Sequence, residues 1–155
     1  MLQDGDKAPD FELPTDDGDT FKLSRAKGKP VVLYFYPKDD TSGCTLEAQN
    51  FSALAPQFRK AGVEVIGISP DSVASHQKFC RKYDLAVRLA ADEDKTIVNA
   101  YGVWVEKSMY GKTYWGNERT TFVLDEDGVV REILRRVKPK EHDERVLAVL
   151  AAATR

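Results

Sequence analysis

The chain has 155 residues, 42% of them hydrophobic and 31% charged, as expected for one folded domain that completes its core without a disulfide or a metal. Its 23 basic and 25 acidic residues give a net charge of −2, which argues against a nucleic-acid-binding protein and gives no reason to expect an anionic membrane partner. No apolar run approaches the roughly 20 residues of a membrane span, and the N-terminus has neither a signal-peptide nor a transit-peptide pattern. We therefore expect a single domain over residues 1–155 in a reducing, cytoplasmic compartment.

Apolar periodicity and turn residues predict an alternation of strands and helices. In the first half of the chain, the pattern indicates a β-hairpin over residues 9–23, a buried strand over 31–36, a helix from near Cys44 to a cap at Gly62 and a strand over 63–68. A helix capped by Asp71 or Ser72, a short strand at 87–89 and a short helix over 95–101 follow. The last third contains an irregular aromatic stretch over 103–116, a hairpin of strands over 119–124 and 129–134, and a helix opened by Pro139. Pro56 is expected to kink or split the first helix. The expected inward-facing residues are Val73, His76, Cys80 and Tyr83 on the second helix, and Val146, Leu147 and Leu150 on the last.

The order of these elements indicates an α/β protein. Each strand–helix–strand unit implies parallel pairing, because the helix returns the chain to the starting edge of the sheet. The late hairpin adds antiparallel strands. The sequence therefore predicts a mixed central β-sheet with helices on both faces and a β-hairpin at the N-terminus. A thioredoxin-like fold fits, although the pattern alone does not separate it from other small α/β folds.

The loop from Pro37 to Cys44 is the most informative segment. A buried strand leads into this polar loop, and Cys44 follows in the first turn of the next helix. The free N–H groups and the helix dipole there favour a thiolate, which is the nucleophilic form of cysteine. Thr41 can offer its hydroxyl close to the sulfur. Chemistry alone leaves a second interpretation open, in which Cys44 is a small residue packed at a helix start.

The same segment resembles the active-site motif of the peroxiredoxins, in which proline, three residues, threonine, two residues and cysteine follow one another. Pro37, Thr41 and Cys44 match this motif. Residues 36–48 resemble the bacterioferritin comigratory protein, or peroxiredoxin Q, subfamily. Four further segments resemble it in a consistent order, namely residues 8–11, 67–71, 109–112 and 119–122. The resemblance covers nearly the whole chain and implies a thioredoxin-like fold and a thiol-dependent peroxidase.

The resemblance also implies roles for individual residues. Cys44 is expected to be the peroxidatic cysteine, which attacks a hydroperoxide and becomes a sulfenic acid without a metal, haem or other cofactor. Thr41 is expected to hydrogen-bond the sulfur and the peroxide, and Pro37 to shield the sulfur from water. Arg119 is expected to stabilise the charge of the thiolate and of the transition state, the alternative being a surface cation at a strand end. Glu47, one helical turn after Cys44, is expected to hold Arg119 or polarise the site, or else to be a solvated helix carboxylate.

The chain departs from the subfamily at the second, resolving cysteine. Many members carry it five residues after the first, where this chain has Gln49. Cys80 stands 36 residues beyond Cys44, and a minority of the subfamily resolves from that helix. We therefore expect an intramolecular disulfide to Cys80, with one helix partly unwinding because a disulfide needs Cα atoms roughly 4.4–6.8 Å apart. The alternative is a one-cysteine peroxidase in which Cys80 is a core residue.

The resemblance implies hydrogen peroxide and organic hydroperoxides as substrates, thioredoxin or glutaredoxin as reductant, and a monomeric protein. No metal, nucleic-acid or membrane partner is expected.

Three alternative functions compete with this interpretation. A metal-binding module could use His76 and Cys80, completed by Cys44 and His142, but the chain lacks the close ligand pairs of a closed zinc site. A dithiol reductase would need a Cys-x-x-Cys motif, which the chain lacks. A non-enzymatic thioredoxin-fold binding domain stays open if Cys44 is inert. The aromatic stretch over 103–116 lacks the basic groove of a nucleic-acid platform, so we expect it to pack near the active site or to dock a reductase.

Overall fold

The computed structural model describes residues 1–138 and 142–154. Its central sheet is built from β3 (Val31–Phe35), β4 (Glu64–Ser69), β5 (Arg88–Ala91), β8 (Thr120–Leu124) and β9 (Val130–Leu134). The strands lie in the order β5-β4-β3-β8-β9. β3 pairs parallel with β4 and β4 with β5, whereas β8 is antiparallel to both β3 and β9. This is the mixed sheet that the element order predicts.

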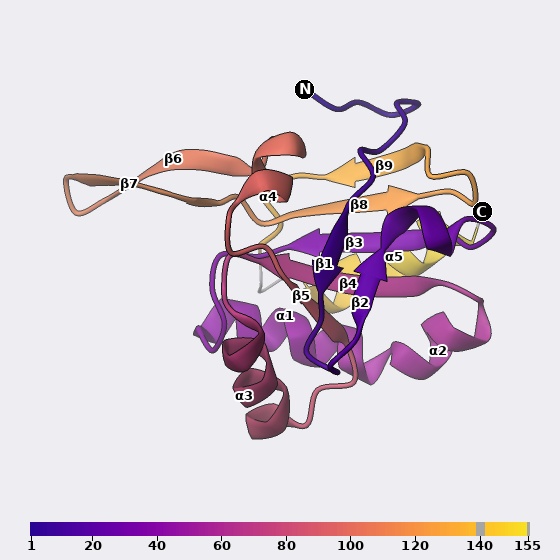
Figure 1. Cartoon of the computed structure of the whole chain (residues 1–155), viewed down its shortest axis with the longest axis horizontal. Coiled ribbons are helices and arrows are strands. Elements are labelled where there is room, and N and C mark those ends of the chain that lie inside the picture. Colours follow the sequence, from indigo (N-terminus) through magenta and orange to yellow (C-terminus); the bar gives the residue numbers. More distant parts are fainter. Residues whose placement is uncertain (139–141, 155) are drawn as a thin grey trace.

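Different elements cover the two faces of the sheet (Figure 1). The helices are α1 (Ser42–Ala53), α2 (Ala55–Lys60), α3 (Val73–Tyr83), α4 (Thr96–Ala100) and α5 (His142–Ala153), with a short 3-10 helix η1 (Leu23–Ala26). Helices α1, α2, α3 and α5 bury their apolar residues on one face. On the other face, α4 packs beside the N-terminal hairpin of β1 (Glu12–Pro14) and β2 (Thr20–Lys22). All five residues of β3 are buried, because successive side chains point into the two covered faces in turn.

Tyr34 of β3 shows how closely the helix-covered face is packed. Its ring stacks on that of Phe51 with centroids 4.5 Å apart. The parallel register places Gly67 of β4 beside it, and a Cβ at Gly67 would lie 2.6 Å from Cζ of the tyrosine. Position 67 therefore has room for no side chain, because the side chains of Tyr34 and Leu89 fill that space.

Pro56 splits the first long helix, as predicted. α1 ends at Ala53 and α2 begins at Ala55, so that the proline lies in a first turn. A proline is tolerated there because the first N–H groups of a helix have no partner within the helix. Gly62 follows α2 with a φ of +73°, in agreement with its expected place at the helix end.

Helix α3 begins at the cap that the sequence offers. Ser72 is the N-cap, and its hydroxyl accepts a hydrogen bond from the Ser75 N–H at 3.1 Å. His76 and Phe79 are the buried residues of the helix, and Cys80 is half-buried. Cys80 and Tyr83 pack partly buried against the same apolar cluster, so the expected stripe is correct for His76, Cys80 and Tyr83, and Phe79 adds a buried contact that was not expected.

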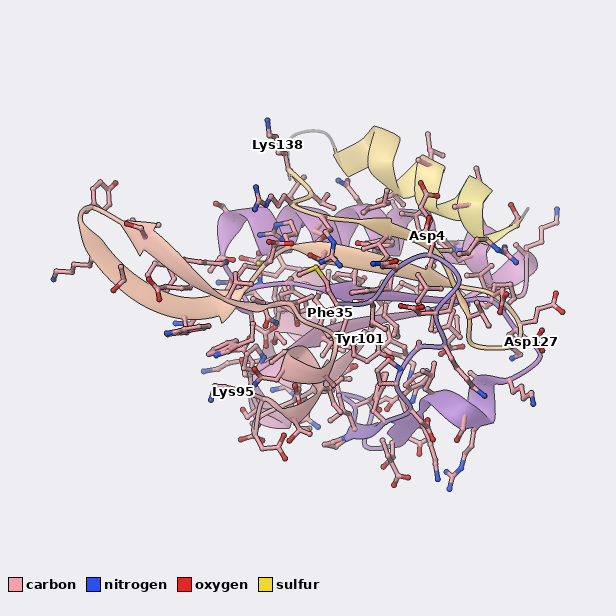
Figure 2. The ribbon with its side chains drawn as sticks, turned by 90° about the horizontal axis from the view of Figure 1, so that it is seen from above. Asp4, Phe35, Lys95, Tyr101, Asp127 and Lys138 are labelled. Atoms are coloured by element: carbon pink, nitrogen blue, oxygen red, sulfur yellow. The ribbon has the colours of Figure 1, made fainter. Side chains whose placement is uncertain are left out.

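The aromatic stretch over residues 103–116 is not irregular, and this prediction was wrong. It forms an antiparallel hairpin of β6 (Trp104–Met109) and β7 (Lys112–Asn117), which extends away from the rest of the protein (Figures 1 and 2). Tyr110 and Gly111 make the turn with φ values of +53° and +77°, as in two-residue turns that match the twist of the strands. Most residues of the hairpin are exposed, so the apolar alternation that identifies a strand is missing.

The last helix differs from the prediction at Leu147. Val146 and Val149 are buried, and Leu150 packs partly against the same cluster. Leu147 is 56% exposed, because positions 146, 149 and 150 already define the inward face at helical spacing. Pro139 lies outside the described residues.

Candidate active site

Cys44 is the third residue of α1 and follows directly on the loop from β3. Thr41 is the N-cap, in an extended conformation with φ −92° and ψ 154°. The cysteine is 1% exposed and belongs to the apolar cluster between the sheet and the helices. Its sulfur is thus shielded from water. It lies at the N-terminal end of a 12-residue helix, where unpaired N–H groups favour negative charge.

Arg119 brings a cation to this sulfur from the neighbouring strand. Because Phe35 of β3 pairs with Thr120 of β8, the residue before β8 lies beside the end of β3. Nη2 of Arg119 donates to Sγ of Cys44 at 3.2 Å. Although burial alone disfavours the cation, the negative charges of Glu47 and Cys44 raise the pKa of Arg119, so the guanidinium stays charged. The structure brings Arg119 to the sulfur and excludes the alternative of a surface cation.

Glu47 holds the guanidinium from the other side. Its Oε1 accepts from Nη1 of Arg119 at 2.7 Å. The side chain is fully buried, so the alternative of a solvated helix carboxylate was wrong. Burial raises the pKa of Glu47 to about 7, against the opposing effect of Arg119. One planar guanidinium therefore joins a buried carboxyl group to a buried thiol, and its hydrogen bonds to these two partners fix its orientation.

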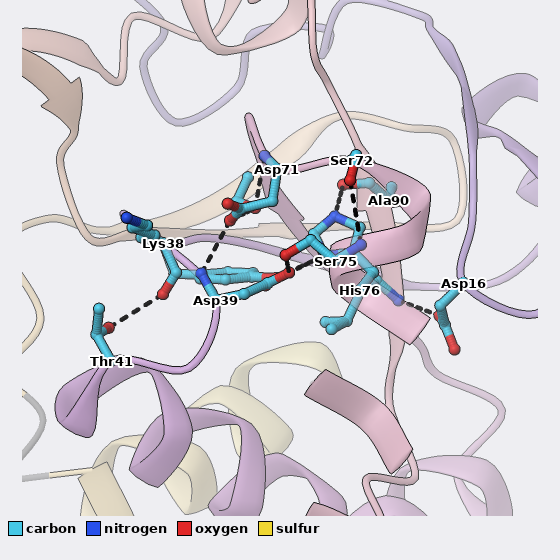
Figure 3. A network of polar contacts seen from close by, with 12 residues as sticks. Asp16, Lys38, Asp39, Thr41, Asp71, Ser72, Ser75, His76 and Ala90 are labelled. Atoms are coloured by element: carbon cyan, nitrogen blue, oxygen red, sulfur yellow. Dashed lines mark hydrogen bonds and ion pairs between the residues drawn. The ribbon is translucent and has the colours of Figure 1, made fainter. Parts of the chain in front are cut away.

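Thr41 and Pro37 belong to the same loop. Pro37 is half-buried directly after the buried Tyr36. The hydroxyl of Thr41 is exposed and donates to the carbonyl oxygen of Lys38 at 3.0 Å (Figure 3). Its one proton is thereby used, so the oxygen presents lone pairs. The oxygen of Thr41 is therefore available as an acceptor, and its expected hydrogen bonds to the sulfur and to a peroxide stay predictions.

Cys80 lies in the second half of α3 in a very different setting. Both cysteines are free thiols. Burial, followed by the negative charge and hydrogen bonding of Asp16, raises the pKa of Cys80 to about 12. Both cysteines lie close to Tyr34, whose pKa is raised first by its own burial and then by the charges of Glu47, Cys80 and Cys44. The structure thus places both cysteines on the same face of the sheet, with Cys80 as an unreactive thiol.

Comparison with known proteins identifies the family. Residues 5–133 match the AhpC/TSA family. A Coxiella burnetii protein named as a peroxiredoxin of the Bcp type is 52% identical over 141 residues, covering 91% of this chain and 93% of that protein. The chain belongs to the AhpC/TSA family. Peroxiredoxin Bcp of Bacillus subtilis is 44% identical over 149 residues, covering 96% and 95% of the two chains, so the resemblance to the Bcp, or peroxiredoxin Q, subfamily is confirmed and the chain is a peroxidase.

Solved structures confirm the thioredoxin-like fold of this peroxiredoxin. The Xanthomonas campestris bacterioferritin comigratory protein, whose structures address its alkyl peroxide reduction activity, superposes with a TM-score of 0.86 at 42% identity, covering 94% of this chain and 92% of that one. A cysteine-to-serine mutant of Xylella fastidiosa peroxiredoxin Q superposes with a TM-score of 0.91 at 35% identity, covering 100% and 99%. The mixed sheet and its helices are those of peroxiredoxin Q structures.

Sequence reasoning missed two residues at the base of the β6–β7 hairpin. Asn117 is fully buried and its Nδ2 donates to the carbonyl oxygen of Tyr36 at 3.1 Å, which ties the hairpin to the end of β3. The ammonium of Lys107 donates to the carbonyl oxygen of Asn117, and burial, followed by the charge of Arg119, lowers the pKa of Lys107. An uncharged polar residue three positions before the fully buried strand β8 was the available signal. The hairpin therefore adjoins the site through its base, in agreement with the expectation that this stretch packs near the active site.

Sequence reasoning also missed a buried polar network between the Cys44 loop and α3 (Figure 3). Asp39 of the loop is 7% exposed and His76 of α3 is fully buried. Oδ2 of Asp39 lies 2.7 Å from Nδ1 of His76, and Oδ1 accepts from the hydroxyl of Tyr36 at 2.6 Å. Nε2 of His76 lies 3.0 Å from the carbonyl oxygen of Ala90. An apolar pattern with one histidine gave no sign of this network, because its acceptors are distant in sequence.

The alternative of a metal-binding module finds no support in residues 1–138 and 146–154, whose side chains the structure describes. That part of the chain contains no group of three or more His, Cys, Asp or Glu residues that could hold a metal ion. Both ring nitrogens of His76 already have partners, and the side chain of His142 is outside the described residues. None of the described helices is long and apolar enough to cross a membrane.

Proposed function

We propose that this peroxiredoxin reduces hydrogen peroxide and organic hydroperoxides with Cys44 as its peroxidatic cysteine. The observation that carries the proposal is the 3.2 Å hydrogen bond from Arg119 to the sulfur of Cys44. A buried cation at this distance and the helix N-terminus both favour the thiolate, the form that attacks peroxides. The alkyl peroxide reduction of the Xanthomonas campestris protein supports organic hydroperoxides among the substrates.

The first step is a displacement on oxygen. The thiolate of Cys44 attacks the terminal oxygen of the hydroperoxide, so that the S–O bond forms while the O–O bond breaks. The leaving oxygen takes up a proton and departs as water or an alcohol, and Cys44 becomes a sulfenic acid. Arg119 stabilises the negative charge as it passes from sulfur to the leaving oxygen. Glu47 acts as a positioning residue, because it orients the guanidinium without touching the sulfur.

The loop supplies the remaining contacts. The Thr41 oxygen, whose proton is donated to the carbonyl of Lys38, accepts a hydrogen bond from the peroxide hydroxyl and so orients the O–O bond. Pro37 shields the sulfur from water on the side of the loop. Both roles need only the backbone conformation that precedes α1, so the site is formed before the peroxide arrives.

The second step assigns the resolving role to Cys80. Structures of the Xanthomonas campestris peroxiredoxin Q include two cysteine-to-serine mutants at positions 36 residues apart, the separation of Cys44 and Cys80. The Cys80 thiol gives up its proton and attacks the sulfenic sulfur, so that the disulfide forms and water leaves. A dithiol reductant, thioredoxin or glutaredoxin, then returns two electrons and two protons. We further propose a monomeric protein in the cytoplasm, where such dithiols are kept reduced.

Intact mass spectrometry after one equivalent of hydrogen peroxide tests both steps. Loss of two hydrogens from a monomer is the expected result. A stable gain of one oxygen would instead support the one-cysteine peroxidase, an alternative that the high pKa of Cys80, about 12, favours. Cys44→Ser is the control and should show neither change. An unchanged mass of the wild-type protein would contradict the role of Cys44.

A further inference from the structure

Cys80 cannot attack from its place in α3. It lies within a helix, and burial with the charge of Asp16 raises its pKa to about 12, whereas disulfide formation requires a thiolate. The resolving step, which rests on the proposed function, therefore needs α3 to come away from the loop that carries Cys44. The contacts between this loop and α3 are the ones that must break.

Two groups of contacts join the loop to α3. The outer one is exposed, where the carboxylate of Asp40 accepts from Nζ of Lys82 at 2.7 Å and from the hydroxyl of Tyr83 at 2.6 Å. Water competes for such pairs, so they contribute little to holding α3. The inner one is the contact of Asp39 with His76, whose side chains are 4% and 0% exposed, and Oδ2 of Asp39 also accepts from the hydroxyl of Ser75 at 2.8 Å. A buried pair is costly to separate, because each partner is left without its hydrogen bond.

The geometry fixes the number of protons in the inner contact. The carbonyl oxygen of Ala90 can only accept, so Nε2 of His76 carries a hydrogen. Nδ1 faces Oδ2 of Asp39 at 2.7 Å, and two lone pairs at this distance would repel, so a proton lies between them. Tyr36 does not supply it, because its hydroxyl donates to Oδ1, and burial, followed by the charge of Asp39, raises the pKa of Tyr36 well above its usual value. The pair thus holds one proton more than a neutral imidazole beside a carboxylate.

We propose that Asp39 and His76 form a proton-dependent latch that holds the Cys80 helix on the peroxidatic loop, and that opening of this latch sets the rate of disulfide formation. Both are positioning residues, which act on the reaction through α3. Once α3 is released into water, an imidazole titrates near pH 6.5 and a carboxyl group near 3.9. Above about pH 6.5 release therefore frees the shared proton, and the opening equilibrium rises up to about tenfold per pH unit until the closed pair loses its proton too.

Other polar and charged groups also surround the latch. They are Tyr36 from β3, Asp71 from the loop after β4, Ser75, Lys78 and Lys82 from α3, Asp40 from the Cys44 loop, and Asp16 from the turn after β1. Asp92, the residue after β5, accepts from the Val98 N–H at 2.8 Å, and burial raises its pKa. The Cys80 thiol on α3 has a pKa of about 12 in place and near 8.5 in water, so its release favours opening only from about pH 8.5 upward. A pH dependence of opening between about pH 6.5 and 8 that His76→Gln and Asp39→Asn abolish is therefore assigned to the Asp39–His76 pair.

Amide hydrogen exchange of α3, in the reduced full-length protein without peroxide, measures the opening. We expect the protection of residues 73–83 to fall with rising pH by up to about tenfold per unit, after correction for intrinsic exchange. His76→Gln and Asp39→Asn each remove the shared proton, so protection should be lower by about tenfold or more and independent of pH. Ala74→Gly is the matched control: it weakens the exposed side of α3 by up to about fivefold and should keep the wild-type pH slope. A wild-type slope of zero, or a slope that persists in both latch variants, would overturn the latch.

Quenched-flow mass spectrometry after one equivalent of hydrogen peroxide links the latch to the reaction. His76→Gln should form sulfenic acid at the wild-type rate. It should convert the sulfenic acid to the disulfide faster than the wild type, by the same factor by which the amide protection of its α3 is reduced. Unchanged disulfide formation would overturn the control of the resolving step. Should no variant form sulfenic acid, the proposed function fails, and this outcome is recognisable because the exchange experiment needs no peroxide.

Discussion

The two cysteines have opposite electrostatic surroundings within one apolar cluster. Cys44 begins a helix and has the guanidinium of Arg119 at 3.2 Å. Cys80 lies inside a helix, beside the carboxylate of Asp16, and its pKa is raised to about 12. The same side chain is thus prepared for attack in one place and kept protonated in the other, by helix position and by the sign of the nearest charge. In the proposed mechanism this difference orders the two steps, because Cys80 would become a nucleophile only after its surroundings change.

The strongest test of this difference is Cys44→Ser. We expect peroxide turnover to be abolished, since a serine hydroxyl is hardly ionised at neutral pH and Cys80 cannot take its place. The fold should persist, because serine fits the space and can accept the hydrogen bond from Arg119. Turnover measured with a dithiol reductant checks this, with circular dichroism as the control for folding. Substantial remaining turnover would assign the chemistry to another residue.

Cys80→Ser separates the two half-reactions. The variant should reduce one equivalent of peroxide at the wild-type rate, because Arg119 and Thr41 are unaffected. It should lose turnover with thioredoxin, since no disulfide forms for the dithiol to attack, and Gln49 cannot substitute in α1. At high peroxide its sulfenic acid should proceed to sulfinic acid, a gain of two oxygens by mass spectrometry. Undiminished thioredoxin-dependent turnover would make Cys80 a core residue.

Arg119→Met removes the cation beside Cys44 while keeping an unbranched, flexible side chain. We expect peroxide reduction to slow by roughly 100-fold or more, the usual effect of losing a charge-stabilising donor. The pH at which Cys44 is alkylated should rise, because the thiolate loses its nearest positive charge. Stopped-flow kinetics and an alkylation profile, recorded in a Cys80→Ser background, measure the two effects. An unchanged alkylation profile would show that the guanidinium does not act on the sulfur.

Glu47→Gln tests the carboxyl group that positions this cation. The folded pKa of Glu47 is about 7 and the unfolded one about 4.3, so between these values the native state binds more protons. The stability that this provides is complete below about pH 4.3 and is lost as the pH rises through about 7. Glutamine does not titrate, so the variant lacks this pH dependence. Between pH 5 and 7 the unfolding free energy of the wild type should therefore fall by on the order of 2 kcal/mol more than that of the variant. Urea unfolding at a series of pH values measures this, and parallel curves for the two proteins would contradict the buried, raised carboxyl.

Most of the sheet could be predicted because its strands are buried on both faces. The apolar run over residues 31–36 corresponds to β3, and Pro56 and Gly62 mark the ends of α1 and α2 through backbone chemistry alone. The hairpin of β6 and β7 could not be predicted from alternation, since most of its side chains face water. Leu147 was placed inward because four-residue spacing defines a stripe but not which edge of it meets the sheet.

The site was only partly predictable for a related reason. The spacing of Pro37, Thr41 and Cys44 lies within one loop and can be read directly from the chain. The contact of Arg119 with Glu47 joins residues 72 positions apart and depends on the antiparallel register of β3 and β8. The burial of Asp39 with His76 likewise requires the packing of α3 on the sheet, which no local pattern contains.

Asp16→Asn should have the smallest effect of these variants, a partial lowering of the raised pKa of Cys80. Burial is the largest cause of the high pKa of Cys80, and the charge of Asp16 comes second, so removing the charge should lower the pKa only in part. The amide keeps an oxygen for the Leu89 N–H, which now donates to the carboxylate at 2.7 Å, so the turn after β1 should stay in place. In a Cys44→Ser background, we expect the alkylation midpoint of Cys80 to fall by about one pH unit or less, with Asp17→Asn as a control of smaller effect. Identical midpoints for the parent and Asp16→Asn would mean that burial alone keeps Cys80 protonated, and release of α3 would then be sufficient to activate it.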